Sequence, residues 1–164
     1  MACGYTGEDG FEISMPASSA VKLARELIRD ENVKLAGLGA RDSLRLEAGL
    51  CLYGNDITIE TTPVDSALTC HKSLNTFFVT GLVSKQGPPA RQGATILSED
   101  GQELGKITSG CPSPSLGSNI AMGYVPTSYS KVGTNVNLKI RDKVYEAVVA
   151  KMPFVKANYY NKPK

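Results

Sequence analysis

Residues 135–149 read Asn-Val-Asn-Leu-Lys-Ile-Arg-Asp-Lys-Val-Tyr-Glu-Ala-Val-Val, and this stretch indicates the fold of the second half of the chain. Apolar and polar residues alternate from Asn135 to Ile140, which is the period of a half-buried strand. Arg141-Asp142-Lys143 predicts a turn, and Val144 to Val149 predicts a returning strand. The stretch therefore predicts an antiparallel hairpin with one face in a hydrophobic core.

Further short strands are predicted on the N-terminal side of this hairpin. Glu99-Asp100-Gly101 is a hairpin signal between two of them. The serine- and proline-rich segment Thr108–Leu116 is expected to be a rigid loop. Several short strands at this spacing are typical of a small closed antiparallel β-barrel, which we expect over residues 79–164. The additional strands are expected at Phe77–Val79, Thr95–Leu97, Glu103–Thr108 and Asn119–Val125.

Residues 1–68 mix helix and strand patterns, so the fold class predicted for the chain is α+β. Phe11 to Met15 alternates as a strand does, and Val33 to Leu38 is a second short strand candidate. Helices are predicted after a cap at Ser18 or Ser19 and over Ala40–Ala48. The apolar side of the first helix consists of Val21, Ala24, Leu27 and Ile28, and its other side is charged.

Residues 69–78 match neither half and form an atypical junction, which holds the only histidine, His71, beside Cys70. Two neighbours in sequence face each other only at a sharp backbone turn, so catalysis by this pair is not expected. The four cysteines never form a Cys-x-x-Cys pair, which argues against a zinc site and a disulfide framework. We expect reduced thiols, with Cys51 and Cys111 partly buried, and no metal.

Charge and hydropathy argue against two broad classes of partner. The 164 residues include 18 Lys+Arg and 16 Asp+Glu, and a net charge of +2 is too small for a general nucleic-acid binder. Apolar runs such as 147–150 are far shorter than the ~20 residues that span a bilayer. The first residues show no apolar signal-peptide core. We therefore expect neither nucleic acid nor membrane as a partner.

Glu12 is the first candidate binding residue. It follows a glycine-rich turn, Gly4–Gly10, and lies opposite Phe11 and Ile13 in the predicted strand. If its face of the strand lines a pocket, the carboxylate suits a planar ligand edge with two donors, such as an aminopyrimidine ring. If that face is in solvent, Glu12 is an ordinary surface residue.

Arg41 is the second candidate. Arg41 and Arg45 are four residues apart and share a helix face, and Asp42 can neutralise Arg45. Arg41 then remains near the helix N-terminus, where the helix dipole disfavours a cation. This placement indicates either an anionic or acceptor ligand for Arg41, or a surface salt bridge.

Motifs along nearly the whole chain resemble the aminomethyltransferase of the glycine cleavage system, the T-protein, in its C-terminal part. The resemblance is specific because the motifs occur in family order. They are Gly4–Glu12, Leu35–Leu50, Tyr53–Asp56, Thr61–Val64, Thr108–Leu116, Asn119–Val125, Met152–Val155 and Asn158–Tyr160.

The resemblance implies a fold, a reaction and three binding residues. The fold is the second part of a folate-binding α+β domain followed by a small antiparallel β-barrel. The reaction transfers the one-carbon unit of the aminomethyl group on lipoylated H-protein to tetrahydrofolate and releases ammonia. Glu12 matches the family's folate-binding glutamate, Arg41 its folate-site arginine, and Tyr159 a ligand-contacting tyrosine. In eukaryotes the family resides in the mitochondrial matrix.

The resemblance supplies no catalytic residue for these 164 residues. The family's catalytic aspartate lies in its N-terminal half, and neither Asp9 nor Asp42 is assigned to that role. An isolated chain without that half is expected to be inactive, because catalysis requires the reacting groups in near-attack geometry.

Two alternatives belong to other functional classes. One is a non-catalytic folate-binding or protein-interaction module, as in relatives that serve iron–sulfur assembly, but their Lys-Gly-Cys motif is not found. The other is the folate portion of dimethylglycine or sarcosine dehydrogenases. Cys111–Leu116 and Asn158–Tyr160 favour the glycine cleavage family over both.

Overall fold

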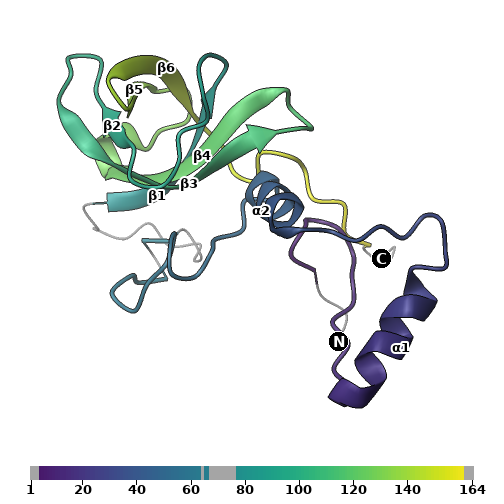
Figure 1. Ribbon diagram of the computed structural model, residues 1–164. Coiled ribbons are helices and arrows are strands. Elements are labelled where there is room, and N and C mark those ends of the chain that lie inside the picture. Colours follow the sequence, from purple (N-terminus) through teal and green to yellow (C-terminus); the bar gives the residue numbers. More distant parts are fainter. Residues whose placement is uncertain (1–3, 64, 67–76, 161–164) are drawn as a thin grey trace.

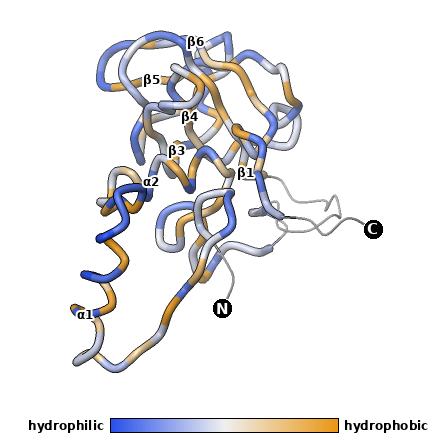
Figure 2. The backbone as a smooth tube through the Cα atoms, turned by 90° about the vertical axis from the view of Figure 1, so that its right-hand side faces the viewer, coloured by the Kyte–Doolittle hydropathy of each residue, from blue (hydrophilic) through white to orange (hydrophobic). Residues whose placement is uncertain are grey.

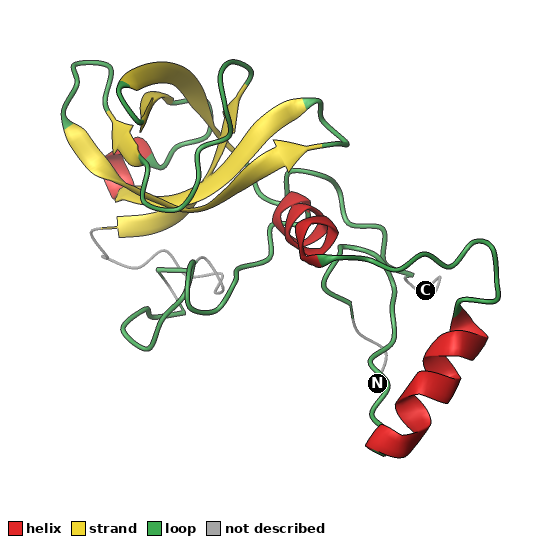
Figure 3. Cartoon of the chain, viewed as in Figure 1, coloured by secondary structure: helices red, strands yellow, loops and turns green. Residues whose placement is uncertain are grey.

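The second half of the chain closes into a six-stranded antiparallel barrel (Figures 1 and 3). The computed structural model describes residues 4–63, 65–66 and 77–160. The strands are neighbours in the order β1-β4-β3-β2-β5-β6, and β6 pairs with β1 to close the barrel. Their bounds are β1 Phe77–Ser84, β2 Thr95–Leu97, β3 Glu103–Ser113, β4 Ser118–Pro126, β5 Asn135–Ile140 and β6 Lys143–Ala150, with a short 3-10 helix at Thr127–Tyr129. The predicted barrel is confirmed.

The predicted hairpin is confirmed as strands β5 and β6. Val136 lies opposite Ala147 and Leu138 opposite Tyr145. Val136, Leu138 and Ala147 are buried with Leu82, Ile96, Ile107 and Val125 in the barrel core. The alternation in the sequence therefore reports which strand face points inward.

The loop expected over Thr108–Leu116 is wrong for its first six residues. Residues 108–113 extend β3, and Ser109, Cys111 and Ser113 are buried on the side of the strand that faces α2. Pro112 is tolerated because the pairing of β3 with β2 ends at Lys106, so this stretch has a free edge. Only the residues after Ser113 form the tight turn into β4.

Both predicted helices form, and both strands predicted before residue 40 are absent. Helix α1 spans Ala17–Leu27 and helix α2 spans Leu38–Glu47. Residues 12–16 and 33–37 have no strand assignment, and Phe11 and Ile13 are exposed. A strand needs a neighbour for its backbone hydrogen bonds, and no named strand among the described residues lies beside these two segments.

Helix α2 joins the N-terminal residues to the barrel. It packs on β3 and β4, and Leu46 is fully buried with Val79, Ile120 and Met122. The C-terminal tail returns to this layer, since the Val155 N–H donates to the Glu47 carbonyl and the Asn158 N–H to the Gly7 carbonyl.

The predicted boundaries between the two parts stay predictions. Residues 69–76 of the expected junction lie outside the described residues, and residues 77 and 78 already belong to β1. Within the described part of the chain, neither helix is long and apolar enough to cross a membrane.

Candidate functional site

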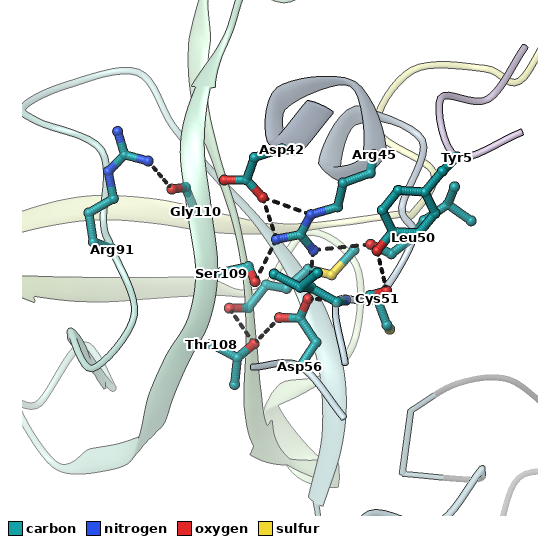
Figure 4. Close-up of polar contacts among 12 residues, drawn as sticks. Tyr5, Asp42, Arg45, Leu50, Cys51, Asp56, Arg91, Thr108, Ser109 and Gly110 are labelled. Atoms are coloured by element: carbon teal, nitrogen blue, oxygen red, sulfur yellow. Dashed lines mark hydrogen bonds and ion pairs between the residues drawn. The ribbon is translucent and has the colours of Figure 1, made fainter. Parts of the chain in front are cut away.

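The centre of the candidate site is a guanidinium held between α2 and the barrel (Figure 4). Arg45 is buried and donates through Nε to Asp42 Oδ1 at 2.8 Å and through one terminal nitrogen to Asp56 Oδ2 at 2.6 Å. The other terminal nitrogen donates to Ser109 Oγ at 2.8 Å. The predicted pairing of Asp42 with Arg45 is confirmed.

Asp56 is the second buried charge of this network. Besides Arg45 it accepts hydrogen bonds from the Thr108 hydroxyl at 2.6 Å and the Leu52 backbone N–H at 2.8 Å. Burial by itself lowers the pKa of Arg45, but the hydrogen bonds and charges of Asp42 and Asp56 outweigh it and raise the pKa above its ordinary value. Arg45 therefore stays cationic, and the network joins α2, the loop at Asp56 and strand β3 into one unit.

Glu47, at the last position of α2, fastens the helix to the turn between β3 and β4. One carboxylate oxygen accepts from the Ser113 hydroxyl and, at 3.0 Å, from the Ser115 N–H. The other accepts from the Ser115 hydroxyl at 2.7 Å. Burial alone raises the pKa of Glu47, but these three hydrogen bonds together hold it below its ordinary value.

Replacing this carboxylate is expected to change the pH dependence of stability. Because the native-state pKa of Glu47 is lowered, the stability that its carboxylate contributes is fully present above the unfolded-state pKa. This stability is lost as pH falls through the native-state pKa. Glu47→Gln should cost about 1–2 kcal/mol of unfolding free energy at neutral pH, the difference between charged and neutral hydrogen bonds. Urea unfolding from pH 7 to pH 3 measures it, with exposed Glu26→Gln as control. If Glu47→Gln lowered the unfolding free energy as much at pH 3 as at pH 7, the charged hydrogen bonds assigned to Glu47 would be contradicted.

A pocket of about 520 Å³ opens beside this network. Arg41 lines it from α2 and Arg91 from the loop before β2, and Arg45 contributes to its wall. The Arg41 guanidinium lies over the Tyr5 ring, 4.4 Å from the centroid, and the Tyr5 hydroxyl donates to the Cys51 carbonyl. None of the ion pairs found among the described residues involves Arg41. A ligand role for Arg41 stays a prediction.

The structure does not bring the other two predicted binding residues to this pocket. Tyr159 lines a separate recess with residues 4 and 8–11. Glu12 follows Phe11 of this recess in the sequence, but its side chain is exposed and lines neither pocket. Glu12 and Tyr159 therefore stay near one another in the fold, and Arg41 lies on α2 at a different pocket.

The described cysteines behave as expected. Cys51 is half-buried, Cys111 is buried, and both are free thiols. Burial raises the pKa of each thiol, which keeps it protonated and unreactive at neutral pH. No group of residues suited to a metal ion occurs in the described ranges. Cys3, Cys70 and His71 lie outside the described residues.

Sequence reasoning missed the buried partners of the site. Asp56 lies 11 residues and Ser109 lies 64 residues from Arg45, and Ser113 lies 66 residues from Glu47. No spacing rule connects positions this far apart.

Two family profiles place this architecture in the class of GCVT proteins. Residues 1–75 match the GCVT N-terminal domain. Residues 78–156 match the glycine cleavage T-protein C-terminal barrel domain. The matches follow one another along the chain, as the α2 layer and the barrel do in the structure.

Individual relatives agree with the profiles. The chain is 50% identical over 178 residues to the mitochondrial aminomethyltransferase of Mus musculus, covering 96% of this chain and 44% of the relative. The mitochondrial aminomethyltransferase of Gallus gallus is 51% identical, with 96% and 45% covered. The glycine cleavage system aminomethyltransferase T from Bartonella henselae superposes with a TM-score of 0.89 at 41% identity, covering 96% of this chain and 50% of that chain. The chain belongs to the glycine cleavage T-protein family, and it spans about half the length of these relatives.

Proposed function

We propose that this chain provides the second half of a tetrahydrofolate-dependent aminomethyltransferase. The reaction transfers the one-carbon unit from the aminomethyl group on the lipoyl arm of H-protein to tetrahydrofolate, with release of ammonia and formation of 5,10-methylenetetrahydrofolate. The supporting observation is the superposition on the Bartonella henselae aminomethyltransferase, which extends over both parts of the chain. The names of the Mus musculus and Gallus gallus relatives support the same activity and a mitochondrial location.

Three residues are proposed to hold the folate. Arg41 offers a guanidinium at the 520 Å³ pocket, where it suits an acceptor or carboxylate group of the folate. Glu12 is proposed to accept two hydrogen bonds from the donor edge of the pterin, and Tyr159 to contact the ligand. Since Tyr159 lines another recess and Glu12 is next to Phe11 of that recess, the three residues reach one ligand only if it extends from one pocket past the other.

The described residues do not supply an obvious catalytic acid. Asp42 is engaged by Arg45 through two nitrogens, which supports its role as a structural partner rather than a catalytic group. Asp9 accepts a hydrogen bond from the Tyr160 N–H. Turnover is therefore proposed only for an assembly that includes the other half of the family's chain.

Tetrahydrofolate binding is expected to depend on Arg41 and Glu12. Loss of a charged hydrogen bond costs about 1.5–3 kcal/mol, so Arg41→Ala and Glu12→Ala should each weaken binding about 10-fold or more. Isothermal titration of tetrahydrofolate into the 164-residue chain measures this, with exposed Arg29→Ala as the matched control. No binding, or equal affinity in all variants, would contradict the folate site. Binding without turnover in the assembly with the other half would favour the non-catalytic module.

A further inference from the structure

A series of exposed apolar side chains runs from residue 11 to residue 35, outside the candidate site. No residue of α1 is buried. Phe11 and Leu35, on either side of α1 in the sequence, are each more than four-fifths exposed. We call this the N-terminal apolar surface; its members are Phe11, Ile13, Val21, Leu27, Ile28, Val33 and Leu35.

Helix α1 has the sequence of a helix that buries one side. Val21, Ala24, Leu27 and Ile28 gather on one side, and the opposite side carries Lys22, Arg25, Glu26 and Arg29. In Figure 1 the helix stands apart from the barrel, and in Figure 2 hydrophobic and hydrophilic stretches alternate along it. Among the described elements, α2 packs on two strands and α1 has no comparable packing. A large exposed apolar surface of this kind is typical of an interaction site.

The coverage of the Bartonella henselae protein is the observation from which we argue the occupant of this surface. The superposition covers 96% of this chain. The residues outside it are therefore fewer than the 11 residues of α1. The same backbone arrangement therefore occurs in a protein of which this chain matches 50%. The other half of that chain is the polypeptide available there to pack against an amphipathic α1.

We propose that the N-terminal apolar surface binds the half of the T-protein fold that lies outside these 164 residues, and that the two halves associate when they are separate polypeptides. The interface uses the apolar side of α1 and the neighbouring Phe11 and Leu35. The inference depends on the family and the exposed surface, and it does not depend on the proposed transfer reaction.

Co-expression with a complementary fragment tests the proposal. The part of the Mus musculus relative outside the match carries an affinity tag, and the amount of the untagged 164-residue chain that co-purifies is measured. The apolar-side variant is Val21→Glu with Leu27→Glu, and the matched charged-side variant is Lys22→Glu with Arg25→Glu. A circular dichroism melt checks that the barrel unfolds alike in all three chains, as exposed positions on α1 predict.

We expect a 1:1 complex for the natural chain and for the charged-side variant, and at least a tenfold loss of complex for the apolar-side variant. Failure of the natural chain to co-purify would overturn the proposal, and so would equal complex formation by both variants. Light scattering of the chain alone gives a further outcome. A dimer that the apolar-side variant abolishes would identify a second copy as the occupant and would also overturn it. Folate binding is measured separately, so either proposal can fail alone.

Discussion

Arg45→Ala is expected to lower the unfolding free energy of the chain by about 3–5 kcal/mol, because it leaves the Asp56 carboxylate buried without its cationic partner. The Asp56 side chain is fully buried, and the Arg45 side chain is almost so. Thr108 and Leu52 still donate to Asp56 in the variant, but neither is charged. Urea unfolding followed by circular dichroism gives the free energy and the midpoint.

Arg29→Ala is the matched control for this prediction, since Arg29 also pairs with a carboxylate three residues away. Its pair with Glu26 is exposed, so its loss should cost no more than about 1 kcal/mol. The double variant Arg45→Ala with Asp56→Ala should be less destabilised than the sum of the two single variants, because the unpaired charge is gone. A loss below 1 kcal/mol for Arg45→Ala alone would show that the network does not hold α2 on the barrel.

The sequence predicted the barrel well because its strands carry their own evidence of burial. Val136 and Leu138 are separated by one polar residue and both are buried. Phe11 and Ile13 show the same alternation, yet they are exposed and form no strand. The alternation of apolar and polar residues indicates which side chains favour burial. A strand also requires a neighbouring strand about 4.8 Å away for its backbone hydrogen bonds. The two strands predicted before residue 40 do not form because the described chain offers them no such partner.

The candidate site was predictable only where its contacts are local. Asp42 and Arg45 are three residues apart, so helix geometry alone predicts their pairing. The same geometry left Arg41 without a local carboxylate, and the structure places it at the pocket. Asp56, Ser109 and Ser113 join the site through the packing of α2 on β3, which no local pattern encodes.

The loop before β2 rests on β3 through a close backbone approach at Gly110, in the part of β3 that the sequence analysis assigned to a loop. A Cβ atom there would lie 1.9 Å from the carbonyl oxygen of Ala90 and 3.2 Å from the Ala121 Cβ. The strand cannot move away freely, because Gly110 pairs with Ala121 on β4 and its carbonyl accepts from Arg91 at 2.8 Å.

Gly110→Ala is therefore expected to destabilise the barrel by at least the upper end of the usual range for overpacking, about 3 kcal/mol. Gly39→Ala on α2 is the matched control, since no atom lies within 4 Å of the added Cβ. Alanine favours the helix over glycine, so the control should be stabilised by up to about 1 kcal/mol. Thermal and urea unfolding of both variants measure the difference. If Gly110→Ala unfolds like the natural chain, the loop before β2 does not rest on β3, and the wall of the pocket that Arg91 and Gly110 share is not fixed.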